Sequence, residues 1–167
     1  MIGFGYDIHR LERDKTLVLG GITIPWEKGT VAHSDGDAAL HAVCDALLGA
    51  AMLGDIGTHF PDSSPEFAGI SSLELLRRVV GLVREKNYTL INIDVTIVLE
   101  RPKIAQYIPR MRDAIEPIIN TTSNPATTAS TYISIKATTN EGLGGVGAGD
   151  AVAAFAVAQI ERMDRTK

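Results

Sequence analysis

In the opening segment MIGFGYDIH, residues 2–9 alternate strictly between large, mainly apolar side chains and small or polar ones. A period of two is typical of a β-strand, because successive side chains of a strand point to opposite faces of the sheet. The two sets are Ile2, Phe4, Tyr6 and Ile8 on one face, and Gly3, Gly5, Asp7 and His9 on the other. The pattern therefore predicts a strand that presents an acid and a histidine side by side.

In later segments, the apolar residues recur either every two residues, as in this strand, or every three to four residues, which is typical of helices. Strands are predicted at 16–25 (a strand or hairpin broken at Gly20-Gly21), 92–99 and 132–139, and helices at 37–53, 72–86 and 104–118. We expect Ser34 or Asp35 to cap the first helix. Segment 151–160 is ambiguous, because its alanines favour a helix whereas its valines and phenylalanine favour a buried strand.

The remaining segments are rich in glycine, proline and small polar residues. Irregular loops are expected at 54–67 and 120–131, and a glycine-rich turn at 142–150. Strands and helices alternate without a repeat or linker, so we expect a single domain over residues 1–167 with no second enzyme fused to it. The fold class is α/β (α+β), with helices packed on a sheet.

The composition argues against several kinds of partner. The net charge is −4 and no run of Lys or Arg exceeds two residues, which argues against nucleic acid. No apolar stretch reaches membrane-spanning length, and the start of the chain lacks the pattern of a signal peptide. The single cysteine, Cys44, excludes an intrachain disulfide and fits a reducing compartment. We expect a cytoplasmic protein with no membrane or nucleic-acid partner.

Three side chains have the chemistry of a transition-metal site. Asp7 and His9 share one face of the first strand, and His41 on the first helix supplies a third ligand. Asp37 and Asp45 are each four residues from His41, so either is a candidate to hold its second ring nitrogen. The alternative is a chance D-x-H pattern with a hydrogen-bonded helix histidine.

Two further segments suit an anion. His33-Ser34 precedes a helix start, where free N–H groups favour negative charge. Thr138, Thr139 and the following glycine turn form a second candidate cradle for phosphate. Glu141 is a hard oxygen ligand for magnesium or manganese. The alternative is that these glycines only make tight turns.

Together these stretches resemble the 2-C-methyl-D-erythritol 2,4-cyclodiphosphate synthase family of the non-mevalonate isoprenoid pathway. The resemblance covers nearly the whole chain. The segments that carry it, in the family's order, are GYDIHRL, LGGITIP, AHSDGDAALHAVCDALLGAAMLGDIG, HFPD, DVTIVLERPK and IKATTNEGLG.

The resemblance implies roles for individual residues. Asp7, His9 and His41 match ligands of zinc, or of another divalent transition metal, and Glu141 matches a ligand of a second ion, Mg²⁺ or Mn²⁺. His33 and Thr139 are the implied catalytic residues. The implied substrate-binding residues are Asp7, His9, His33, Ser34, Asp55, Ile56, Gly57, Phe60, Pro61, Asp62, Ser63, Ser64, Leu99, Pro102, Lys103, Ile104, Ala105, Ala137, Thr138, Thr139, Asn140 and Glu141.

The resemblance also implies an assembly and a reaction. The expected fold has a mixed four-stranded sheet with helices on one face, and assembles as a homotrimer around a central β-lined cavity with active sites between subunits. The implied substrate is 4-diphosphocytidyl-2-C-methyl-D-erythritol 2-phosphate, whose 2-phosphate attacks the β-phosphorus and expels CMP. A protein nucleophile is not required for this reaction.

The chain departs from the family at two places. Gly145 and Ala148 stand where a phenylalanine and an arginine are usual, beside a cavity on the threefold axis. We therefore predict that this protein binds no isoprenoid diphosphate there through a ring of arginines. The 120–131 connection also looks longer than usual, and is expected to be a tolerated surface insertion.

Overall fold

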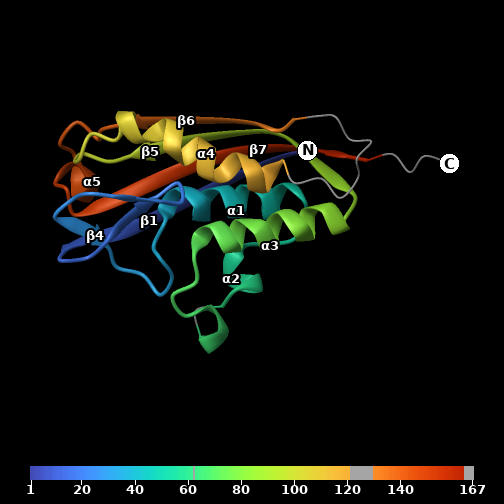
Figure 1. Cartoon of the computed structure of the whole chain (residues 1–167), viewed down its shortest axis with the longest axis horizontal. Coiled ribbons are helices and arrows are strands. Elements are labelled where there is room, and N and C mark those ends of the chain that lie inside the picture. Colours follow the sequence, from blue (N-terminus) through green and yellow to red (C-terminus); the bar gives the residue numbers. More distant parts are fainter. Residues whose placement is uncertain (62, 121–129, 164–167) are drawn as a thin grey trace.

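The computed structural model describes residues 1–61, 63–120 and 130–163. A mixed sheet of five strands, in the order β4-β1-β7-β5-β6, forms one layer of the fold (Figure 1). These strands are β1 (Ile2–Arg13), β4 (Lys28–Thr30), β5 (Tyr88–Val98), β6 (Tyr132–Thr138) and β7 (Ala151–Arg162). The prediction of four strands is wrong, because the short strand β4 pairs antiparallel with the end of β1 and widens the sheet.

The pairing of the central strands explains the chain path. β7 runs antiparallel to both β1 and β5, whereas β5 and β6 are parallel. Parallel neighbours need a crossover, and helix α4 (Ile108–Ile119) provides it. The predicted hairpin is present outside this sheet as β2 (Leu17–Leu19) and β3 (Ile22–Ile24).

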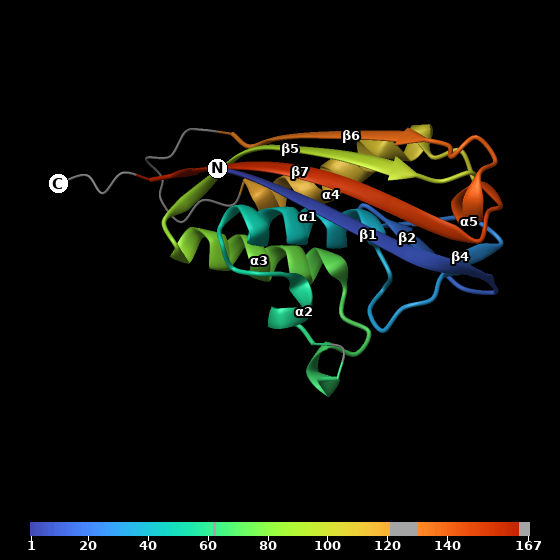
Figure 2. The same cartoon turned by 180° about the vertical axis from the view of Figure 1, so that it is seen from behind.

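The long helices pack on one face of the sheet (Figures 1 and 2). Helix α1 (Ala38–Ala50) lies against β1 and β7, and α3 (Ser72–Glu85) packs beside α1. The prediction that Ser34 or Asp35 caps α1 is wrong: the cap is Asp37, which accepts a hydrogen bond from the backbone N–H of Leu40 at 3.1 Å.

Segment 151–160 is strand, which settles the ambiguity of its sequence. Its side chains alternate between the covered and the open face. The covered set consists of Val152, Ala154, Ala156, Ala158 and Ile160. Alanines at these positions let α1 approach the sheet closely, so tertiary packing outweighs their helix propensity.

Short helical turns occupy segments for which loops and turns were predicted. They are α2 (Ile56–His59), η1 (Pro65–Phe67) and α5 (Gly144–Gly147), and a further turn η2 (Ala105–Tyr107) precedes α4. Most of the predicted 120–131 loop, residues 121–129, lies outside the described residues. Within the described ranges, no helix has the length and apolar character needed to cross a membrane.

The other face of the sheet is uncovered, and it is apolar along β1 and β7. The alternating residues of β1 point outward here, with Ile2 73% and Phe4 64% exposed. Phe155 and Val157 of β7 continue this surface, and the rings of Phe4 and Phe155 have centroids 6.3 Å apart. The first strand therefore directs its apolar side chains to the outside, and its glycines, Asp7 and His9 toward α1.

Candidate metal centre and adjoining pockets

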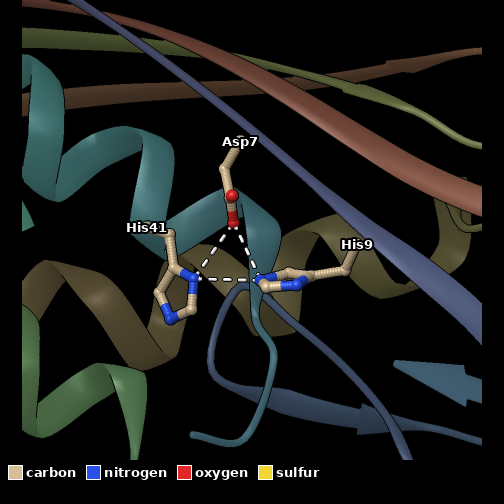
Figure 3. Close-up of side chains that lie close together, drawn as sticks. All are labelled: Asp7, His9 and His41. Carbon is tan, nitrogen blue, oxygen red and sulfur yellow. Dashed lines mark hydrogen bonds and ion pairs between the residues drawn. The ribbon is translucent and has the colours of Figure 1, made fainter. Parts of the chain in front are cut away.

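Three side chains from two elements meet between the sheet and α1. Asp7 and His9 lie on the covered face of β1, and His41 lies in the first turn of α1 (Figure 3). Asp7 Oδ2 lies 3.0 Å from both His9 Nε2 and His41 Nδ1, and the two nitrogens lie 3.1 Å apart. The structure thus brings together the three residues that the sequence analysis selected.

This arrangement suits a divalent transition metal. Ligands held about 2.0–2.1 Å from a tetrahedral zinc ion lie roughly 3.3 Å apart, so the observed spacings need little adjustment. One carboxylate and two imidazoles are ligands that such ions prefer. Within the described residues, the group contains no fourth His, Cys, Asp or Glu ligand. Three protein ligands are typical of a catalytic site with an open position, whereas structural zinc sites have four.

The close contacts also shift pKa values. Burial alone would raise the pKa of Asp7, but hydrogen bonds with His41 and His9 hold it well below its usual range. Burial alone would lower the pKa of His41, but the contact with Asp7 outweighs this effect, so the pKa of His41 is raised. Asp7 is therefore ionised at neutral pH, as a metal-binding carboxylate must be.

The second nitrogen of His41 faces hydroxyl groups. Ser72 Oγ lies 3.0 Å and Ser34 Oγ 3.3 Å from His41 Nε2. The prediction that Asp37 or Asp45 holds this nitrogen is wrong, because both carboxylates bind backbone N–H groups elsewhere. Asp37 accepts from Gly20, Gly21 and Leu40, and Asp45 accepts from Ile56.

A pocket of about 370 Å³ adjoins the three candidate ligands, which form part of its lining. Of the residues expected to bind substrate, it contains Asp7, His9, His33, Ser34, Ile56, Gly57 and Phe60. Asp55, Pro61, Ser63 and Ser64 do not line it, and Asp62 lies outside the described residues. The sequence analysis missed Val31, Ala32, Phe67, Ala68, Ile70 and Leu75, which also line it. These apolar residues carry no signal of binding that separates them from core residues.

A second pocket, of about 170 Å³, lies beside the carboxyl end of β6. All of its lining residues were expected to bind substrate: Leu99, Pro102, Lys103, Ile104, Ala105, Ala137, Thr138 and Thr139. The two pockets share no lining residue. In a single chain, the expected substrate site is therefore divided between two separate places.

Asn140 and Glu141 lie in a tight loop after β6. Glu141 is exposed, has a φ of 50°, and accepts a hydrogen bond from Thr139 Oγ1 at 2.9 Å. Glu100 Oε2 accepts from the backbone N–H groups of Asn140 and Gly142, at 3.2 and 3.5 Å. Glu100 thus shapes the loop that carries Glu141. The sequence analysis missed this role, because the two segments meet only in the folded chain.

The fold and site define an α/β protein with a mixed sheet, a three-ligand metal-binding group and an adjoining pocket. The chain belongs to the YgbB family, whose model matches residues 1–161. The resemblance predicted from the sequence is confirmed.

Several known relatives of this chain are cyclodiphosphate synthases, and one is a bifunctional protein. The 2-C-methyl-D-erythritol 2,4-cyclodiphosphate synthase of Symbiobacterium thermophilum is 54% identical over 160 residues, which is 96% of this chain and 98% of the relative. A solved synthase structure, in a form with bound CDP, is 37% identical with a TM-score of 0.83, over 96% of this chain and 100% of the other. The bifunctional IspDF of Campylobacter jejuni is 35% identical with a TM-score of 0.87, over 99% of this chain and 43% of the other.

Proposed function

We propose that this chain is the enzyme that converts 4-diphosphocytidyl-2-C-methyl-D-erythritol 2-phosphate into 2-C-methyl-D-erythritol 2,4-cyclodiphosphate and CMP, a step of non-mevalonate isoprenoid synthesis. The observation that carries the proposal is the convergence of Asp7, His9 and His41 at a pocket, in a chain of this family. The CDP-bound relative supports a cytidine nucleotide as the ligand class.

The chemistry is an intramolecular phosphoryl transfer. An oxygen of the substrate's 2-phosphate forms a bond to the β-phosphorus, and the bond from that phosphorus to the oxygen of CMP breaks. A metal ion held by Asp7, His9 and His41, zinc in our proposal, would polarise the phosphorus and neutralise charge on the phosphate oxygens. The chain itself positions the two ends of a flexible substrate. Such positioning can lower the activation free energy by roughly 7–11 kcal/mol.

We assign the pockets to the two ends of the substrate. The pocket beside Asp7 and His9 receives the methylerythritol phosphate, with Ile56 and Gly57 along its wall. His33, exposed in the loop before α1, is free to approach the phosphates and stabilise the transition state.

The pocket after β6 receives the cytosine end, with Lys103 at its rim. Thr138 and Thr139 follow at the end of β6 and contact the diphosphate in this proposal. Glu141 is exposed beside them and would hold the second ion, Mg²⁺ or Mn²⁺. Thr139 is our second catalytic candidate, after His33.

We further propose a homotrimer whose sheets face a central cavity. Two observations support it: the apolar face of β1 and β7 is uncovered in a single chain, and the two pockets lie apart. In a trimer, the metal pocket of one subunit would meet the cytosine pocket of its neighbour. We place the enzyme in the cytoplasm, as the composition and the single cysteine suggest.

The direct test supplies the substrate to the zinc-loaded protein in ¹⁸O-labelled water. Cyclisation consumes no water, so we expect CMP and a cyclic diphosphate without ¹⁸O. A linear phosphate carrying one ¹⁸O atom would instead identify a hydrolytic phosphoesterase. Absence of any reaction, with a fourth protein ligand on the metal, would identify a structural zinc module.

A further inference from the structure

A buried serine, remote in sequence from the candidate metal centre, connects it to the carboxylate of Asp35. Ser72, the first residue of α3, is fully buried. Its Oγ lies 2.5 Å from Asp35 Oδ1 and 3.0 Å from His41 Nε2. A three-member chain, Asp35–Ser72–His41, therefore ends on the histidine whose other nitrogen faces Asp7.

The direction of the hydrogen bonds follows from the number of protons. An ionised carboxylate only accepts, so the single hydroxyl proton of Ser72 is donated to Asp35. The lone pairs of Ser72 Oγ then remain to accept a proton from His41 Nε2. Because a neutral imidazole carries one N–H, a proton on Nε2 leaves a free lone pair on Nδ1. Because Nδ1 lies 3.0 Å from Asp7 Oδ2 and 3.1 Å from His9 Nε2, that lone pair would be directed at an ion held by the three residues.

We infer that Asp35 and Ser72 are positioning residues that hold His41 in the ring orientation and tautomer in which Nδ1 is available to a metal ion. The inference rests on the proposed metal centre, and it is independent of the reaction carried out there. Hydrogen bonds to the outer nitrogen of a ligand histidine are a general means of orienting that ligand.

Asp35 is itself firmly held. Its Oδ2 accepts the backbone N–H of Ser72 at 2.8 Å, and its Oδ1 also accepts the N–H of Asp37 at 3.3 Å. The backbone N–H of Asp35 donates to the carbonyl of Ile70 at 3.3 Å. Both carboxylate oxygens are thus fixed by backbone groups at the start of α1 and of α3. Ser34 Oγ is a more distant second neighbour of His41 Nε2, at 3.3 Å, and accepts the N–H of Gly36.

The first test is Ser72→Ala, with Zn²⁺ affinity measured by competition with a chromophoric chelator. We expect affinity to fall roughly 10–100-fold. The matched control is Ser71→Ala, which removes an exposed hydroxyl that caps the same helix at Leu73 and does not contact His41. This control should keep Zn²⁺ affinity within about twofold of the unaltered protein.

The second test measures how fast the His41 Nε2 proton exchanges with solvent in Zn²⁺-loaded protein, by ¹⁵N NMR of the histidine rings. With Nδ1 bound to the metal the ring proton is on Nε2, and in the unaltered protein its hydrogen bond to Ser72 Oγ should make the exchange slow. In Asp35→Asn, the amide oxygen must face the N–H of Ser72, so its NH₂ group faces Ser72 Oγ. The hydroxyl proton is then directed at His41 Nε2, the Nε2–H loses its acceptor, and its exchange with solvent should become faster.

Each test has a result that would overturn the inference. A Ser72→Ala variant with unchanged Zn²⁺ affinity, or a Ser71→Ala variant weakened equally, would overturn the inference. If Ser72→Ala does not fold, an unchanged exchange rate of the His41 Nε2 proton in Asp35→Asn overturns it on its own. If the unaltered protein binds no Zn²⁺, the metal centre and the positioning role fail together, whereas loss of cyclisation with intact Zn²⁺ binding would contradict only the proposed reaction.

Discussion

A side chain on Gly5 of β1 would begin only 2.0 Å from the carbonyl oxygen of Ala42 on α1. Strand and helix therefore touch through their backbones at this point. Asp7 lies two residues farther along the same face of β1, and His41 immediately precedes Ala42. The glycine thus sets the separation at which a strand carboxylate and a helix imidazole reach hydrogen-bond distance.

This contact predicts a strong effect of Gly5→Ala. The added methyl group must push α1 away, so we expect a loss of about 1–3 kcal/mol in the free energy of unfolding, together with weaker Zn²⁺ binding. Urea unfolding and chelator competition measure the two effects. Gly49→Ala on the same helix is the control, because no atom lies within 4 Å of its new methyl group. It should raise stability by about 0.5–1 kcal/mol. Unchanged Zn²⁺ binding in Gly5→Ala would contradict this account of the site.

The separate pocket after β6 predicts a selective loss of nucleotide binding. Ala105→Leu places a larger side chain in a pocket of about 170 Å³. We expect CDP affinity, measured by calorimetry, to fall at least about tenfold because the pocket is filled. Zn²⁺ affinity should stay unchanged, since the pockets share no residue. The neighbouring exposed Gln106→Leu serves as control, and an Ala105→Leu variant that binds CDP normally would place the nucleotide elsewhere.

The uncovered apolar face predicts the state of assembly. A charge introduced by Phe4→Glu would have to be buried in the proposed trimer, which is costly without a partner. Light scattering should then report a trimer for the unaltered protein and for Thr23→Glu, an exposed position on β3, but monomers for Phe4→Glu. A monomeric unaltered protein would refute the trimer.

Active sites between subunits predict complementation between two inactive variants. Asp7→Asn removes a metal ligand, and Glu141→Gln alters the loop that a neighbouring subunit would contribute. Trimers co-expressed from equal amounts should regain about a quarter of full activity, because a random neighbour restores one site in four. Activity no higher than that of either variant alone would indicate that each subunit holds its own complete site.

The spacing of apolar residues along the sequence predicted most of the helices and strands correctly. The alternation before His9 identified β1, and the stripe from Leu73 to Val83 identified α3. The strand β4, of three residues, has too short a pattern to detect, and the alanines of β7 are explained only by the helix packed on them. Local patterns therefore predict elements well, but not the contacts between elements.

The candidate site, too, could be predicted from local patterns only in part. Asp7, His9 and His41 were found from ligand chemistry, whereas the Asp35–Ser72 contact joins residues 37 positions apart and has no local signature. The role of Lys103 came from the family resemblance alone, those of His33 and Glu141 from residue chemistry and the resemblance together, and all three stay predictions. So does the effect of Gly145 and Ala148, which lie in and directly after α5.

The most direct measurement locates the metal in the protein with CDP bound, by anomalous diffraction at the zinc edge. We expect one peak between Asp7 Oδ2, His9 Nε2 and His41 Nδ1, with a phosphate oxygen or water in the fourth position. Absence of a peak there, or a fourth protein ligand that closes the shell, would contradict the claim that this group is the catalytic metal centre.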